Sequence, residues 1–221
     1  MKPRTVQPEL LDSLPPDSPI AAHNRRDLRI TNRVLRNYPW FASTLRPLMP
    51  PFLRPDAKPC ALELGAGIGE LLAHLRDHNI VADGLDLWPR PATLPATQRW
   101  HRADLREFNA FADYPIVFGN FIFHQFSAEE LSALGAKLAR TAHVIVTCEP
   151  ARRRSAQLLF SLIAPLFGAH PVTLHDGRVS IAAGFLGDEL PHALGLDPAR
   201  WSWRCTTTLL GINRVVATRR A

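Results

Sequence analysis

The chain has 221 residues, of which 46% are apolar, so it can bury the core of one α/β domain and is short for two. Its longest apolar stretch, residues 158–168, is too short to cross a bilayer, and its first residues lack the apolar core of a signal peptide, so we expect a cytoplasmic protein. The net charge of +6 comes mainly from scattered arginines, which disfavours nucleic-acid binding. Three cysteines without metal-ligand spacing predict reduced thiols and no metal site.

The first expected element is an amphipathic helix over residues 24–41. Arginines at helical spacing form one stripe of it: Arg25, Arg29, Arg33 and Arg36. This stripe is expected to be a solvated face rather than a surface for anionic lipid or nucleic acid. Asn24, Asp27 and Thr31 fall within the opposite, apolar face, where polar groups need partners. Two interpretations stay open: these side chains bond neighbouring backbone, or the helix is a lid whose Asp27 and Thr31 face a ligand.

The most informative stretch is residues 60–70, where a short apolar run closes on three glycines at alternate positions, Gly65, Gly67 and Gly69. An apolar helical pattern follows at 71–75, so the unit reads as a strand, a tight turn and a helix. Glycines suit this turn because a ligand must lie against the main chain at the helix N-terminus. A dinucleotide fingerprint needs a further glycine at position 70, but the residue there is Glu70. Its carboxylate repels a pyrophosphate and favours a ligand whose nearest part is cationic.

Further strands follow this turn. Residues 79–86 read as a second strand that ends in Asp86, where a carboxylate can accept hydrogen bonds from both hydroxyls of a ribose. A third strand is expected to end near residues 100–101. A fourth begins at 114 and opens at Asn120, and a fifth covers 142–150.

Glu63 followed by the three alternating glycines resembles motif I of the class I S-adenosylmethionine (SAM)-dependent methyltransferases, and the later strands follow in that family's order. The resemblance implies SAM as the cofactor. It places Asp104 beside the adenine amino group and Asn120 where the fourth strand opens toward the substrate. The cofactor-binding residues that it implies are Glu63, Gly65, Gly67, Gly69, Asp86, Leu87, Asp104, Leu105 and Asn120.

The alternation of strands and helices predicts an α/β fold with a Rossmann-like, mostly parallel sheet. Strands at 202–209 and 213–217 are expected to close it as an antiparallel hairpin. Before them come a helix capped by Ser127 and Glu130, a helical segment over 152–167, a turn at 175–177 and a short helix near 187–194. We expect a lid helix and a stiff, non-helical Pro-rich linker over residues 1–58. Residues 59–221 are the expected methyltransferase domain, with segment 151–195 covering the substrate.

The reaction sets the search for catalytic residues. Methyl transfer is an in-line displacement, so the protein must align donor and acceptor and remove a proton from a hydroxyl or acidic carbon. His124 lies four residues after Asn120, which resembles the Asn-to-His-His run of many bacterial small-molecule methyltransferases, with Gln125 in place of the second histidine. We expect His124 as the base and His175 and Asp176 as further catalytic candidates. A purely structural role stays open for all three.

Together these patterns predict a SAM-dependent methyltransferase that acts on oxygen or carbon of a small, aromatic or lipophilic metabolite of secondary metabolism. The substrate-binding candidates are Asp27, Thr31, Phe123 and Gln125. Two alternatives stay open: a nucleic-acid or protein methyltransferase that uses the basic surface, and a SAM-binding assembly or regulatory protein without catalysis. The arginine run 152–154 begins an apolar segment that can touch a membrane surface, although a helix over an apolar pocket is favoured. The sequence carries no signal for an oligomeric state.

Overall fold

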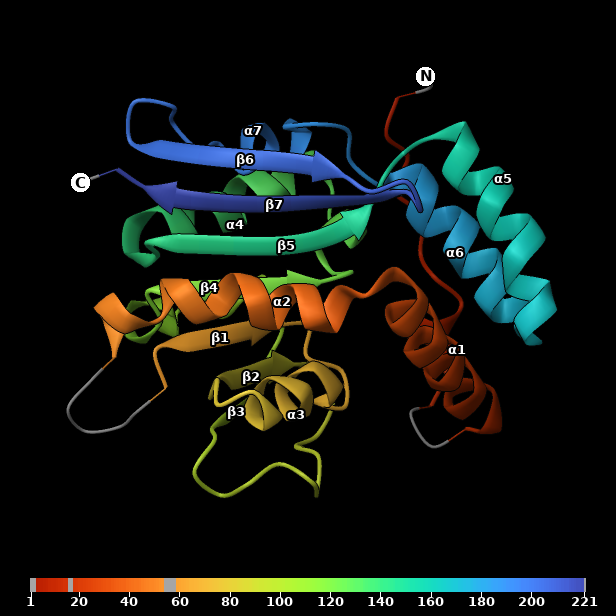
Figure 1. Cartoon of the computed structure of the whole chain (residues 1–221), viewed down its shortest axis with the longest axis horizontal. Coiled ribbons are helices and arrows are strands. Elements are labelled where there is room, and N and C mark those ends of the chain that lie inside the picture. The colour runs from red at the N-terminus through yellow and green to blue at the C-terminus, as the bar shows by residue number, and fades with distance from the viewer. Residues whose placement is uncertain (1–2, 16–17, 54–58, 221) are drawn as a thin grey trace.

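The computed structural model describes residues 3–15, 18–53 and 59–220, and its centre is a seven-stranded sheet (Figure 1). The strands are β1 (Ala61–Leu64), β2 (Asp83–Asp86), β3 (Trp100–Arg102), β4 (Ile116–Asn120), β5 (Val144–Pro150), β6 (Trp201–Thr207) and β7 (Ile212–Arg219). Their order across the sheet is β3-β2-β1-β4-β5-β7-β6. The first five are parallel, and β7 runs antiparallel to β5 and β6. The predicted Rossmann-like sheet with a C-terminal antiparallel hairpin is confirmed.

Helices bury the apolar residues of both sheet faces. On one face lie α2 (Asn37–Leu45) and α3 (Glu70–Asp77), and Phe41 of α2 packs its ring against Phe118 of β4. On the other face lie α4 (Ala128–Thr141) and α7 (Glu189–Ala193), which share a core cluster with Trp201. The predicted capping box starts α4, because Ser127 and Glu130 each accept the other's backbone N–H.

Three more helices lie together at the carboxyl ends of the parallel strands (Figure 1). They are α1 (Pro19–Leu35), α5 (Arg154–Ile163) and α6 (Pro171–Ala183), and we call them the cover helices. The N-terminal segment 3–14, which contains the 3-10 turn η1 (Leu11–Ser13), runs beside α6. Arg4 anchors it, since its guanidinium donates to the carbonyl oxygens of Ala183 at 2.7 Å and His124 at 2.8 Å. Within the described residues, no helix is both long and apolar enough to cross a membrane.

The predicted continuous helix over residues 24–41 is wrong. The chain forms two helices, because Arg36 adopts the left-handed conformation with φ 54° and separates α1 from α2. Pro39 explains the break. A proline in a helix interior removes its own N–H bond and clashes with the carbonyl four residues earlier, which here belongs to Leu35. That carbonyl accepts a hydrogen bond from Arg214 instead, at 2.9 Å.

Two other local predictions are also wrong. The linker expected to be non-helical forms 3-10 turns at η2 (Arg46–Leu48) and η3 (Pro50–Phe52), while residues 54–58 lie outside the described residues. The turn expected at 175–177 is the middle of α6. Gly177 there leaves space for the ring of Phe160 from α5, which a Cβ would overlap. Packing between helices therefore overrides the local turn signal.

Replacement of Gly135 tests the packing of α4. A Cβ at this position would overlap the carbonyl oxygen of Leu194, a backbone atom that cannot move aside cheaply. Gly135→Ala is expected to lower the free energy of unfolding by about 2 kcal/mol or more, despite the better helix propensity of alanine. Urea titration measures it, with the exposed Ala136→Ser as control, expected within about 0.5 kcal/mol of the parent. A Gly135→Ala protein as stable as the parent would contradict this packing.

Candidate active site

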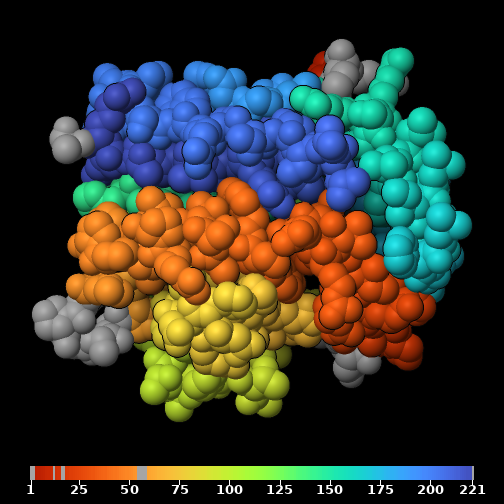
Figure 2. Space-filling model, in the orientation of Figure 1, coloured from red at the N-terminus to blue at the C-terminus, as the bar shows by residue number. Residues whose placement is uncertain are grey.

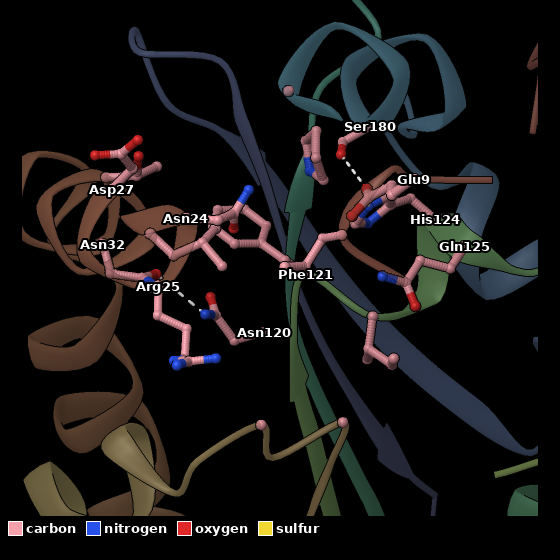
Figure 3. A pocket seen from close by; sticks show the side chains of 18 of the residues that line it. Glu9, Asn24, Arg25, Asp27, Asn32, Asn120, Phe121, His124, Gln125 and Ser180 are labelled. Atoms are coloured by element: carbon pink, nitrogen blue, oxygen red, sulfur yellow. Dashed lines mark hydrogen bonds and ion pairs between the residues drawn. The ribbon is translucent and has the colours of Figure 1, made fainter. Parts of the chain in front are cut away.

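A cavity of about 700 Å³ lies between the carboxyl ends of the parallel strands and the cover helices (Figure 3). The glycine loop after β1 and the ends of β2 and β4 line one part of it, and the cover helices line the other. The predicted site residues that line it are Asp27, Thr31, Glu63, Gly65, Gly67, Asp86, Leu87, Asp104, Leu105, Asn120, His124 and Gln125. The structure thus brings together candidates that are far apart in the sequence.

The glycine loop leaves its main chain open to the cavity. Gly65 and Gly67 have φ of 65° and 57°, which residues with a Cβ rarely adopt. A Cβ at Gly65 would lie 2.6 Å from the side chain of Ile122, whereas a Cβ at Gly67 would meet nothing within 4 Å. Gly69 is the residue before α3 and does not line the cavity. A ligand can therefore lie directly against the backbone at Gly67.

Asp86 closes this loop from the end of β2. Its two carboxylate oxygens accept the backbone N–H of Gly67 at 2.7 Å and of Trp88 at 2.8 Å. Burial raises the pKa of the Asp86 carboxyl, and these N–H groups partly oppose that rise. The carboxylate is thus fixed in place beside the glycine loop.

Glu63 is a buried acid under the same loop. Its side chain is 3% exposed, and Oε2 has no hydrogen-bond partner among the described residues. Burial, together with the negative charges of Asp86 and Glu70, raises the pKa of Glu63 well above its ordinary value. A buried carboxylate in such a place is stabilised by a cation or a proton. This orphaned acid fits a ligand that brings positive charge to the loop.

Asp104 and its neighbours line the same part of the cavity as the glycine loop. Arg106 donates to the Asp104 carboxylate, at 2.6 Å for the closest contact, and these hydrogen bonds lower the pKa of Asp104. Arg106 also bonds Glu130 at 3.1 Å, which ties this loop to α4. Leu87 is 61% exposed and Leu105 is buried, so together they offer an apolar edge next to a carboxylate.

The helix α1 is fastened over the glycine loop. Arg29 bonds Glu70 at 2.8 Å, and Arg25 lies over the ring of Trp88, 5.3 Å from its centroid. A chain of amides adds a third tie, because Asn120 of β4 and Asn37 of α2 both donate to Asn32 Oδ1 at 3.0 Å. Helix α1 is thus tied to α3, to the loop after β2, to α2 and to β4.

His124 lies between the carboxylates of Glu149 and Glu9. Figure 3 shows Glu9 beside the ring. Nδ1 lies 2.7 Å from Glu149 Oε2, and Nε2 lies 3.2 Å from Glu9 Oε1. Burial alone lowers the pKa of His124, but the hydrogen bonds and charges of Glu149 and Glu9 outweigh it and raise the pKa to about 9. Ser180 donates a further bond to Glu9 Oε1. The ring is an imidazolium at neutral pH that donates from both nitrogens.

This arrangement does not support the expectation that His124 itself removes the acceptor proton. A base needs a free lone pair, and both ring nitrogens here carry protons that are shared with carboxylates. Sequence reasoning did not identify either carboxylate of the cluster as a site residue: it missed Glu149 and also Glu9. Glu9 lies 115 residues before His124 in an N-terminal segment without a motif, so no local signal identifies it.

Polar groups of the cover helices lie in or next to the part of the cavity that these helices line. Asp27 accepts the backbone N–H of His170 at 2.9 Å and the hydroxyl of Thr173 at 2.8 Å, so its carboxylate caps and tethers α6. Thr31 lines the cavity beside it, and Gln125 faces the cavity from η5 (Phe123–Gln125). Asn24, also missed as a site residue, is buried and its Oδ1 has no partner among the described residues. Asn24 therefore offers an acceptor to a ligand.

Besides Gly69, three predicted residues lie outside the cavity. Phe123 is fully buried in the core. Asp176 accepts the backbone N–H groups of Leu10 at 2.8 Å and Leu11 at 3.1 Å, and so anchors the N-terminal segment. His175 is exposed and contacts Asp176 at 3.0 Å. These positions do not support a substrate contact for Phe123 or a catalytic role for His175 and Asp176.

Comparison with known proteins places the fold. No family model matches the chain, and no curated protein is similar in sequence. The plantazolicin methyltransferase BamL, in complex with a triazolic desmethylPZN analogue and SAH, aligns with a TM-score of 0.69 over 96% of this chain and 93% of its own, at 10% identity. The chain has the class I methyltransferase fold. The magnesium protoporphyrin IX methyltransferase ChlM from Synechocystis PCC 6803, with bound SAH, shares it with a TM-score of 0.55 over 89% and 86% of the two chains, at 17% identity.

The charge of His124 predicts a pH-dependent stability. A histidine whose pKa is raised by folding stabilises the protein fully below its ordinary pKa, and this contribution is lost as the pH rises through about 9. The free energy of unfolding should therefore fall between about pH 6.5 and pH 9, by up to about 3 kcal/mol. His124→Gln should remove this fall, while His143→Gln, at an exposed position, should keep it. Urea titrations across this range measure it, and a parent protein with constant stability would contradict the buried imidazolium.

Proposed function

We propose that this chain is a SAM-dependent methyltransferase that acts on oxygen or carbon of a small, aromatic or lipophilic acceptor. The observation that carries the proposal is the acidic cradle at the glycine loop. Glu63 is a buried acid whose Oε2 has no hydrogen-bond partner among the described residues, and Asp86 lies at the end of the next strand. A nucleoside with a sulfonium and an ammonium group suits this cradle, whereas a pyrophosphate would be repelled.

The residues divide the binding of the cofactor among them. When bound, SAM supplies a methyl group on a positively charged sulfur. Gly67 offers its open main chain and Asp86 its carboxylate to the ribose, while Asp104 and Leu105 receive the base. Glu63 compensates positive charge from below the loop. The ties of Arg25 and Arg29 hold α1 over this part and exclude water from it.

We call the part of the cavity that the cover helices line the acceptor part. It is mostly apolar, which supports a lipophilic substrate. Leu28 of α1, Leu159, Phe160 and Ile163 of α5 and Ile181 of α6 line it. Asn24, Gln125 and Glu9 are polar groups on its wall. Such a pocket binds a ring system through its apolar walls and orients it through a few hydrogen bonds.

We assign proton removal to Glu9 and a positioning role to His124. Glu9 lines the cavity, and both of its described contacts use Oε1. The hydrogen bonds from His124 and Ser180 hold this carboxylate ionised, and lower the pKa of Glu9 although its burial raises it. A weak base suffices here, because the acceptor proton becomes strongly acidic only as positive charge develops on the methylated oxygen. His124 keeps the carboxylate at the cavity wall.

The cofactor assignment is tested at Asp86. Asp86→Ala removes a fixed, charged acceptor from the glycine loop and should weaken SAM binding at least tenfold, about 1.4 kcal/mol. Isothermal calorimetry measures it, with Asp77→Ala at the exposed end of α3 as the matched control. Unchanged SAM affinity in Asp86→Ala, or tight NADH binding by the parent, would overturn the assignment.

The base assignment is tested at Glu9. Glu9→Gln keeps the shape of the side chain but cannot take a proton, so turnover should fall roughly 10²-fold with SAM affinity unchanged. SAH release with a panel of phenols and quinols measures turnover. Glu129→Gln, at an exposed position on α4, is the matched control. If Glu9→Gln turns over like the parent while His124→Gln does not, the histidine rather than Glu9 handles the proton.

A further inference from the structure

The outer face of α5 carries a row of exposed leucines. Leu158, Leu162 and Leu166 follow each other at four-residue spacing through α5 and the adjoining turn η6 (Ala164–Phe167). Their exposed fractions are 62%, 61% and 82%. Another side of the same helix lines the cavity through Leu159, Phe160 and Ile163. The helix is therefore apolar on two sides, and no described residue buries the outer one, which we call the leucine row.

The surface around the leucine row is basic. Arg154 starts the row one turn before Leu158, and Arg178 of α6 contacts Ser161 of α5 at 3.4 Å. The end of the row adjoins α1, since His23 Nε2 lies 3.3 Å from the carbonyl oxygen of Gly168 (Figure 2). Exposed arginines continue along α1: Arg26, Arg29 and Arg33. The cover helices contain two carboxylates, Asp27 and Asp176, and both are buried.

We propose that the leucine row and the arginines around it dock the protein on an anionic lipid surface. An amphipathic helix binds a bilayer when its apolar side chains enter the boundary of the acyl chains and its cations pair with lipid headgroups. The leucine row supplies the first contact. Arg154, Arg178 and the exposed arginines of α1 supply the second, and the cover helices expose no carboxylate that would repel the headgroups.

Other occupants fit this surface less well. A second copy of the chain would place arginines against arginines, which costs free energy through like-charge repulsion. A nucleic acid would pair with the arginines but would leave the three exposed leucines in contact with phosphate and water. A bilayer with anionic headgroups satisfies both the leucines and the charges.

This inference goes beyond the proposed function and does not depend on methyl transfer. Its link to the acceptor is geometric, because α5 separates the leucine row from the apolar part of the cavity. Docking by this face would put the wall of the acceptor part against the lipid. A lipophilic acceptor could then pass between bilayer and cavity without crossing water.

Vesicle flotation of the full chain tests the proposal. The parent is expected to float with vesicles of phosphatidylcholine mixed with phosphatidylglycerol, more weakly with phosphatidylcholine alone, and less as salt is added. Leu158→Ser/Leu162→Ser should lower the partition coefficient roughly tenfold or more. Arg154→Gln should lower it roughly fivefold.

Two matched substitutions serve as controls. Val81→Ser changes an exposed apolar residue before β2, at the opposite end of the strands, and Arg140→Gln changes an exposed arginine of α4. Both should bind vesicles like the parent. All variants should keep the SAM affinity of the parent, which shows that they are folded.

Three results would overturn the proposal. The first is equal binding of the parent to neutral and anionic vesicles. The second is vesicle binding by the leucine variant that equals that of the parent. The third is a parent that binds no vesicles and self-associates, together with a leucine variant that does not self-associate. The last result would assign the row to a second copy of the chain. If the parent binds vesicles but not SAM, the docking surface is supported and the proposed function is rejected. If the parent binds SAM but not vesicles, the docking surface is rejected and the proposed function stands.

Discussion

Glu149, at the end of β5, is the buried carboxylate on which the acceptor side of the cavity depends. Oε1 accepts the backbone N–H groups of Ile122 and Phe123, at 3.0 and 2.9 Å, and Oε2 accepts that of His124 together with its ring Nδ1. These bonds hold the chain after β4 in the tight turn η5 and fix the orientation of the His124 ring. In this orientation Nε2 of the ring contacts Glu9, so the same cluster also helps to hold the N-terminal segment beside α6. A strand end, a turn and the chain's first residues are thus joined through one carboxylate.

The cavity of the molecule is acidic, whereas the outer surface of its cover helices is basic. The chain is basic, with a net charge of +6, yet the cavity is lined by Glu9, Glu63, Glu70 and Asp86. The arginines of the cover helices lie mainly on the outer surface, where hydration is retained and burial costs nothing. The acidic interior favours a cationic ligand and the basic exterior favours an anionic surface. The cover helices therefore lie between an acidic cavity and a basic outer surface.

Features that depend on local chemistry could be predicted from the sequence. The glycine loop, the acid after the second strand, the capping box of Ser127 and the closing hairpin each follow from a few neighbouring residues, and the structure has them at these positions. The break between α1 and α2 could also have been predicted, because Pro39 cannot continue a helix that includes Leu35. The helical position of Gly177 could not be predicted in this way, because its neighbours signal a turn and its close contact is with the ring of Phe160 on another helix. The cluster around His124 fails for the same reason: Glu9 comes from a distant segment that has no motif.

This difference follows from how the two parts of the cavity are built. The cofactor part is made by loops that directly follow strands, so sequence spacing fixes its geometry, and Asp86 meets Gly67 because parallel strands end at one edge. The acceptor part is made by helices and by an N-terminal segment that pack on one another through single polar contacts, such as Asp27 with α6 and Asp176 with Leu10. Neither of these contacts involves a residue of the sheet. Under the proposed function, the residues that select the acceptor therefore lie in the cover helices and the N-terminal segment, apart from the cradle at the glycine loop.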